Sequence, residues 1–167
     1  MTDAASSSPA TLDKFDRQIL AALQNDPRQP AEKVAAAIGL SATAVQRRIR
    51  RLREAGVIAG ERLLLDAAAL GFGLSVWVEV ELREASRKAV IDGFKHRMAA
   101  EPRVQQCFYV AGDSDFLLLV RCRDVAEFEA LTRELFFDDA NIKKFRSVFV
   151  LDDCKPDAGL PLIDPVD

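Results

Sequence analysis

The 167-residue sequence predicts an α+β protein of two domains, a small helical domain followed by an antiparallel sheet with helices on one face. Three observations lead to this prediction. Apolar residues recur at helical spacing in the first third of the chain, and apolar and polar residues alternate cleanly from Leu74 onwards. Charge divides in the same region, because residues 12–62 carry ten Lys/Arg against six Asp/Glu, whereas residues 63–167 carry thirteen against nineteen. Such asymmetry is typical of a basic binding module joined to an acidic domain.

The composition excludes several classes of protein. Apolar residues make up 49% of the chain and charged residues 29%, as in soluble globular proteins. No window approaches the ~18 uninterrupted apolar residues of a membrane span. Residues 1–11 lack the pattern of a secretory signal, so we expect a disordered polar tail there. Three widely spaced cysteines and a single histidine, His96, predict free thiols in a reducing cytoplasm, with no metal site and no cofactor.

The helical domain is expected at residues 12–66 and begins with two helices. The first spans residues 12–24, and Asp13 and Asp16 in its first turn favour the helix dipole. Its inward residues share helical spacing: Leu12, Phe15, Ile19, Leu20 and Leu23. A second helix fits residues 31–38, and Gly39 ends it in a turn. The pattern therefore predicts two short helices that lead into a tight glycine turn.

A third helix follows, and five arginines fall within its seven residues from Arg47 to Arg53. Ser41 is a good N-cap for it. Its inward face carries Val45, Ile49 and Leu52. At about 100° per residue, its opposite face carries Thr43, Arg47, Arg50, Arg51 and Glu54, with Arg48 and Arg53 on the flanks. This order of elements is that of a helix-turn-helix, whose last helix enters the major groove of duplex DNA.

The residues after this helix predict a β-hairpin wing. Gly56 ends the helix, and Val57–Ile58 and residues 62–65 flank a short turn at residues 59–61. Arg62 on this wing is placed to reach a neighbouring phosphate. The helical domain is therefore predicted to be a winged helix-turn-helix, followed by a linker at residues 67–73.

A solvated amphipathic helix is the common alternative for any run of charged residues. Here only Glu54 lies near the five arginines, so pairing within the helix cannot neutralise them. The preceding turn and cap also favour DNA binding. We expect Arg47 to reach a base edge and the other cations to contact phosphate. The predicted DNA-binding residues are Ser41, Thr43, Gln46, Arg47, Arg50, Arg51 and Arg62.

The second domain is expected at residues 74–154 and is followed by a tail at residues 155–167. Its predicted order of elements is β-α-β-β-α-β. The pattern predicts strands at residues 74–82, 104–110, 116–122 and 145–151, and helices at residues 86–100 and 125–137. This is the ferredoxin-like plan, in which two helices cover one face of an antiparallel sheet. The other face is apolar as well, and its expected members are Trp77, Tyr109, Leu117 and Leu119. Such a face must be covered, most simply by a second subunit, so we expect a homodimer.

Four sequence blocks resemble the Lrp/AsnC family of transcriptional regulators over residues 12–155. They are L-D-x-x-D-x-x-I-L at residues 12–20, G-L-S at 39–41, V-x-x-R-I-x-x-L-x-x-x-G-V-I at 45–58, and G-D-x-D-F-L-L at 112–118. The resemblance implies a winged helix-turn-helix joined to a ferredoxin-like ligand-sensing domain of the RAM type. It also implies dimers that associate into octamers, and a small amino acid or related metabolite as effector.

The resemblance places the effector pocket between subunits, at the turn formed by Gly112, Asp113, Ser114 and Asp115, with Ser147 lining the same pocket. Loop amides and carboxylates suit the two charged groups of an amino acid. Taken alone, the turn residues fit an ordinary hairpin equally well, since Gly, Asp and Ser dominate turns. Phe145 stands near a position that is commonly small and polar in the family, so we expect a reduced pocket.

The sequence thus predicts an effector-responsive, sequence-specific DNA-binding regulator of the cytoplasm and nucleoid. An architectural DNA-binding protein with little sequence preference is the alternative among binding proteins. An enzyme is the alternative from another class, since a branch of similar shape decarboxylates a tetrapyrrole. Such chemistry requires histidines and arginines in the sensing cleft, and His96 is the only histidine that this half of the chain offers. No enzymatic activity is therefore expected.

Overall fold

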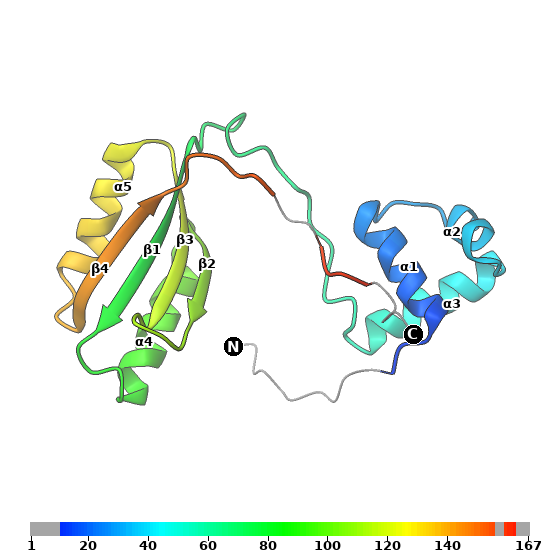
Figure 1. Ribbon diagram of the computed structural model, residues 1–167, viewed down its shortest axis with the longest axis horizontal. Helices are drawn as coiled ribbons and strands as arrows, with labels where there is room; N and C mark the ends of the chain where they lie inside the picture. The colour runs from blue at the N-terminus through cyan, green and yellow to red at the C-terminus, as the bar shows by residue number, and fades with distance from the viewer. Residues whose placement is uncertain (1–10, 156–158, 163–167) are drawn as a thin grey trace. The chain divides into compact units, whose positions relative to one another are not determined.

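The computed structural model describes residues 11–155 and 159–162, and the chain divides into two compact units. Figure 1 draws both units. The division falls between Leu63 and Leu64, and the described residues from Lys155 onwards belong with the first unit. The predicted N-terminal tail at residues 1–11 lies outside the described residues except for Thr11.

The first unit contains three helices: α1 (Lys14–Asn25), α2 (Ala31–Ile38) and α3 (Ala42–Glu54). Asp13 caps α1 through a capping box, in which its carboxylate accepts from the Asp16 N–H at 2.8 Å and the Asp16 carboxylate accepts from the Asp13 N–H at 3.2 Å. The small core of this unit is formed by Ile19, Val34, Ala35 and Val45. Each helix is short, so packing on this shared core supplies most of its stability.

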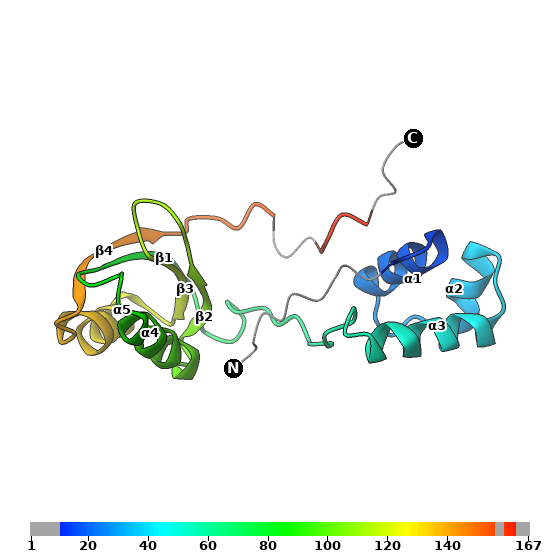
Figure 2. The ribbon, with the colours of Figure 1, turned by 90° about the horizontal axis from the view of Figure 1, so that it is seen from below.

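The turn between α2 and α3 forms as the sequence predicts. Gly39 adopts a left-handed conformation with φ of 74°, which other residues adopt only at a cost. The Ser41 hydroxyl then accepts a hydrogen bond from the Ala44 N–H at 3.2 Å and caps α3. The helix-turn-helix is therefore confirmed (Figure 2).

The predicted β-hairpin wing is wrong for the described part of the chain, in which the first strand begins at Leu74. The backbone N–H groups of Val57 and Ile58 donate to the Leu52 carbonyl at 2.9 and 3.2 Å, and the Gly56 N–H donates to Arg53 at 3.0 Å. This is a Schellman motif, completed by Gly56 at φ 70°. The backbone N–H groups that a strand would need for pairing therefore cap α3 instead. An isolated two-stranded ribbon is marginal in any case.

The second unit is a four-stranded antiparallel sheet in the order β2-β3-β1-β4, with helices on one face (Figure 2). Its strands are β1 (Leu74–Leu82), β2 (Val104–Tyr109), β3 (Phe116–Cys122) and β4 (Ile142–Phe149). Its helices are α4 (Lys88–Ala100) and α5 (Val125–Thr132), and α5 continues into a π-helical turn, η1 (Arg133–Phe137). The βαββαβ plan is confirmed, although β4 starts earlier and ends earlier than expected. No helix in the described ranges is long and apolar enough to cross a membrane.

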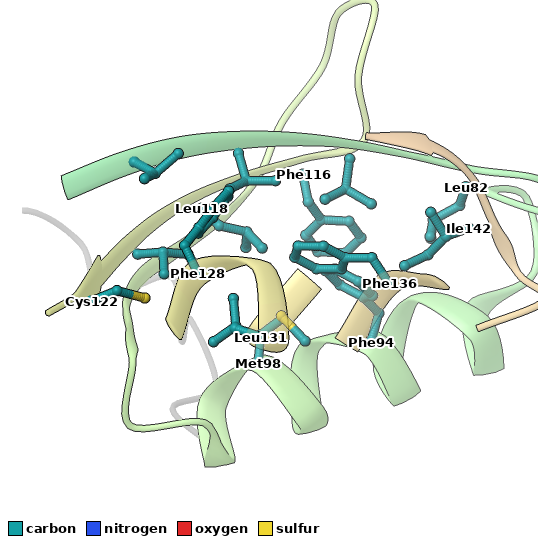
Figure 3. Close-up of a cluster of buried hydrophobic side chains, with 14 residues drawn as sticks. Leu82, Phe94, Met98, Phe116, Leu118, Cys122, Phe128, Leu131, Phe136 and Ile142 are labelled. Atoms are coloured by element: carbon teal, nitrogen blue, oxygen red, sulfur yellow. The ribbon is translucent and has the colours of Figure 1, made fainter. Parts of the chain in front are cut away.

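The core of this unit lies between the sheet and its helices, as Figure 3 shows. Alternate residues of β1 and β3 point into it, and Phe94 of α4 stacks on Phe116 with ring centroids 4.5 Å apart. Burial of these side chains fixes the register of the central strands, because a shift by one residue would expose all of them. The side-chain positions on the opposite face are fixed at the same time.

The opposite face of the sheet is partly apolar, as predicted, but one of its expected members is wrong. Phe108 pairs with Leu117 and lies on this face with 46% of its surface exposed. Tyr109 pairs with Phe116 on the helix side, where their ring centroids are 5.1 Å apart. The register shifts between Val104 and Gln106, and this extra residue inverts the alternation of β2 relative to a regular strand.

Candidate nucleic-acid interface and effector cleft

The predicted DNA-binding side chains are exposed at α3 and in the segment after it. The exposed members are Ser41, Thr43, Gln46, Arg47, Arg50, Arg51 and Arg62. The apolar residues Val45 and Leu52 are buried on the other side of α3. Helical periodicity therefore presents one face of α3 outward, as the sequence predicts.

The arginines of α3 do not all point outward, because two of them bind the carboxylates of Asp13 and Asp16 at the start of α1. Arg48 Nη1 donates to Asp13 Oδ2 at 2.7 Å and to Asp16 Oδ1 at 2.8 Å. Arg51 Nη2 donates to Asp16 Oδ2 at 2.5 Å. Asp16 is only 1% exposed, so its charge depends on these partners. The two arginines therefore tie α3 to α1.

The electrostatics of this cluster follow from the hydrogen bonds. The backbone hydrogen bond from Asp16 and the Arg48 guanidinium together lower the pKa of Asp13. The carboxylates of Asp13 and Asp16 raise the pKa of Arg48. The Arg48 guanidinium also lies 5.5 Å from the Phe15 ring centroid. The sequence pattern alone predicts only a helix-dipole interaction for Asp16. Its position three residues before Ile19, within an apolar stripe, was the signal for a buried ion pair.

The remaining arginines of α3 fall into two groups. Arg53 pairs with Glu61 in the following segment, with Nη2 and Oε1 2.7 Å apart. Arg47 and Arg50 are exposed, and neither makes an ion pair or a side-chain hydrogen bond within residues 11–155 and 159–162. Two of the five guanidinium groups thus face outward without an acidic partner in this part of the chain.

The turn at residues 112–115 lies between β2 and β3, and Asp115 fastens it to β1. The Asp115 N–H donates to the Val80 carbonyl at 2.9 Å, and its carboxylate accepts from the Leu82 N–H at 2.7 Å. Gly112 is exposed, and a Cβ built on it would meet nothing within 4 Å. Asp115 is therefore committed to the fold, whereas Asp113 is exposed and Ser114 is half-buried.

A cleft of about 170 Å³ opens beside this turn. Its walls come from β1, β4 and the turn: Glu79, Glu81, Asp113, Ser114, Lys144, Phe145 and Arg146. Ser147 does not join them, because it pairs with Val78 and therefore faces the helix side of the sheet. The structure brings together two of the five predicted effector residues, and it adds charged residues of β1 and β4. The run Lys143–Lys144–Phe145–Arg146 was the sequence signal for these cations.

Two ion pairs cross the neighbouring strands at this cleft. Arg146 donates to Glu79 from Nη2 at 2.6 Å and from Nε at 3.1 Å. Lys143 Nζ lies 2.5 Å from Glu81 Oε1. These hydrogen bonds lower the pKa of both glutamates, so both are ionised at neutral pH.

Comparison with known protein families identifies both units. Residues 12–53 match the AsnC-type helix-turn-helix domain, and residues 75–160 match the Lrp/AsnC ligand binding domain. The chain belongs to the Lrp/AsnC family of transcriptional regulators. An HTH-type transcriptional regulator of Sinorhizobium fredii is 36% identical to this Lrp/AsnC chain, over 90% of this chain and 89% of the relative. The leucine-responsive regulatory protein of Rhizobium meliloti is 37% identical, over 84% and 89% of the two chains.

Solved structures of Lrp/AsnC proteins share the arrangement within each unit. A transcriptional regulator of Neisseria meningitidis in complex with L-Met superposes with a TM-score of 0.85 at 28% identity, over 91% of this chain and 97% of that one. The Lrp/AsnC match therefore extends through both units.

Proposed function

We propose that this Lrp/AsnC regulator binds duplex DNA in a sequence-specific manner through α3, and that a small amino acid bound to the second unit modulates this binding. The observation that carries the first part is the division of the α3 arginines. Arg47 and Arg50 point outward, while Arg48, Arg51 and Arg53 are held by acidic side chains. A cation kept away from intramolecular partners on an exposed helix face is suited to a polyanion.

In this proposal, α3 enters the major groove with its N-terminal half against the base edges. Ser41, Thr43 and Gln46 provide hydrogen-bonding groups there, and Arg47 makes a bidentate contact with guanine. Arg50 contacts phosphate. Arg51 is 55% exposed despite its contact with Asp16, so it remains a proposed phosphate contact that is oriented by that carboxylate. Arg62 is proposed to contact phosphate from the extended segment after α3.

The regulator is proposed to act as a homodimer that associates into octamers. The half-exposed apolar side chains on the open face of the sheet support this: Trp77, Phe108, Leu117, Leu119 and Val148. A patch of this kind favours a symmetric partner. A dimer would present two copies of α3 to half-sites about one helical turn apart.

The effector is proposed to bind at the cleft beside the turn that contains Asp113 and Ser114. A related regulator has been solved in complex with L-Met, which supports an amino acid as the class of ligand. Gly112 and Asp115 then shape the turn. Ser147 faces the other side of the sheet in this chain, so its proposed part in ligand binding requires a pocket completed by another subunit.

The test of DNA binding compares the affinity for the protein's own promoter with that for scrambled DNA at several salt concentrations. We expect Arg47→Ala to weaken promoter binding by roughly 5- to 150-fold, equivalent to ~1–3 kcal/mol, and to relax sequence preference. Arg50→Ala should weaken both DNAs equally and reduce the salt slope by about 0.9. Arg133→Ala removes an exposed guanidinium from the second unit and serves as control.

Two outcomes would contradict this proposal. If the Arg47→Ala, Arg50→Ala double variant protects the promoter as well as the wild type does, α3 is not the recognition element. If wild-type protein binds promoter and scrambled DNA equally at every salt concentration, the chain is an architectural DNA-binding protein instead.

A further inference from the structure

Some charged side chains of the cleft beside the turn at residues 112–115 form ion pairs, and others do not. The Glu79 carboxylate is bound by Arg146 through two hydrogen bonds, and Glu81 is bound by Lys143. Asp113 and Lys144 also line the cleft, but neither takes part in an ion pair or a side-chain hydrogen bond in the described part of the chain. The Asp113 carboxylate acts on Arg146, and the Lys144 ammonium group on Glu79 and Glu81, only through space, so both lack a direct partner and remain for a ligand.

These two groups are complementary to an amino acid zwitterion. The ligand carboxylate would be bound by the Lys144 ammonium group, and the ligand ammonium group by the Asp113 carboxylate. The Ser114 hydroxyl also lines the cleft; it donates to the Glu79 carboxylate, so its oxygen remains as an acceptor for the ligand. After both ligand charges are matched, the other ionised residues of the cleft are neutralised by their own pairs. No charge is left over for a charged ligand side chain.

The walls also restrict the polarity and size of the ligand side chain. Apart from Phe145, the lining residues carry charges or a hydroxyl group. The Phe145 ring itself packs on the helix side, with centroid distances of 5.0 Å to Phe136 and 5.4 Å to Phe137. A long apolar side chain would gain little from burial here and would desolvate charged groups. The part of the cleft that this chain encloses, about 170 Å³, suits a small molecule.

We propose that this cleft selects a short, uncharged polar amino acid, of the class of serine, threonine and asparagine, through Lys144 and Asp113. The proposal rests on the effector role of the cleft proposed above. The proposed ligand differs from the L-Met of the related regulator, because Phe145 is the only apolar residue among the described residues that line the cleft.

The experiment is isothermal titration calorimetry of the full-length protein with L-serine, L-asparagine, L-methionine and L-leucine. We expect L-serine or L-asparagine to bind at least tenfold more tightly than L-methionine and L-leucine. Lys144→Gln and Asp113→Asn should each weaken that binding at least tenfold. The controls Lys88→Gln and Asp92→Asn, on exposed positions of α4, should leave it unchanged. Circular dichroism confirms that each variant is folded.

Tighter binding of L-methionine or L-leucine would overturn the proposal, as would unchanged binding of the polar amino acids to folded Lys144→Gln and Asp113→Asn variants. Absence of binding by any of the four would overturn it as well. Promoter affinity is measured on the same preparations without amino acid. If wild-type protein binds the promoter but not the polar amino acids, only the ligand inference fails. If promoter binding is absent, the DNA-binding proposal fails independently.

Discussion

Asp16 is a buried carboxylate in a unit whose core is built from only a few apolar side chains. It accepts from the Asp13 N–H and from the guanidinium groups of Arg48 and Arg51, so its oxygens are satisfied by three donors. A buried charge of this kind is tolerated because its partners come with good geometry. The ion pairs of Asp16 with Arg48 and Arg51 also determine which arginines of α3 remain available for DNA. A single acidic residue on α1 thus links packing of the unit to the shape of its cationic surface.

At this scale we predict that Asp16→Asn destabilises the helical unit by ~2–4 kcal/mol. The amide keeps the shape of the side chain but leaves Arg51 without its acidic partner, and leaves Arg48, which is 21% exposed, with only the Asp13 carboxylate. Asp13→Asn should cost less, because asparagine also caps a helix and this side chain is exposed. Urea-induced unfolding followed by circular dichroism measures both. An Asp16→Asn variant as stable as Asp13→Asn would show that the ion pair is not structural.

At the scale of elements, the features that depend on local chemistry could be predicted from the sequence, and those that depend on distant partners could not. The bounds of α2 are those expected, because Gly39 and the Ser41 cap fix its end and the next beginning. The phase of β2 was wrong, because the extra residue at Gln105 leaves no mark in the pattern. The contact of Arg51 with Asp16 joins residues 35 positions apart, beyond any local rule.

The same limit applies to the candidate cleft. Asp113 and Ser114 were expected from the resemblance of their turn to a known family. Lys144 was missed, because its place in the cleft depends on the pairing of Glu81 with Lys144 across two strands far apart in sequence. Likewise, the hydrogen bonds between the backbone of Leu160 and the Gln24 side chain, at 2.7 and 3.1 Å, place part of the predicted C-terminal tail against α1. Neither contact has a short-range sequence signal.

A glycine in the left-handed conformation ends α3. Gly56 adopts φ 70° in the Schellman motif, whereas Gly60, in the predicted wing, does not have a positive φ. A Cβ at either position would meet nothing within 4 Å, so only backbone conformation distinguishes them. We expect Gly56→Ala to lower the free energy of unfolding by ~1–2 kcal/mol and Gly60→Ala to be nearly neutral, measured by urea unfolding. A large loss at Gly60 would instead indicate a tight hairpin turn there.

For the whole molecule, the open face of the sheet is the surface through which the proposed dimer would form. Leu119 lies in the central strand β3 and points away from the helices, because Leu118 and Val120 on either side of it are buried. A charged residue at this position therefore leaves the core of the unit intact but would be buried without a partner in a dimer formed through this face. Val125, on α5, is also exposed and apolar but lies on the helix side.

We predict that Leu119→Arg converts the assembly to monomers in size-exclusion chromatography with light scattering, whereas Val125→Arg still self-associates. Thermal unfolding should show both variants folded. The monomer should also lose affinity for DNA with two half-sites far more than for DNA with one, because a dimer binds the second half-site at the high effective concentration set by the first. Self-association of folded Leu119→Arg would exclude this face as the interface. Equal losses on both DNAs would show that the two copies of α3 do not bind together.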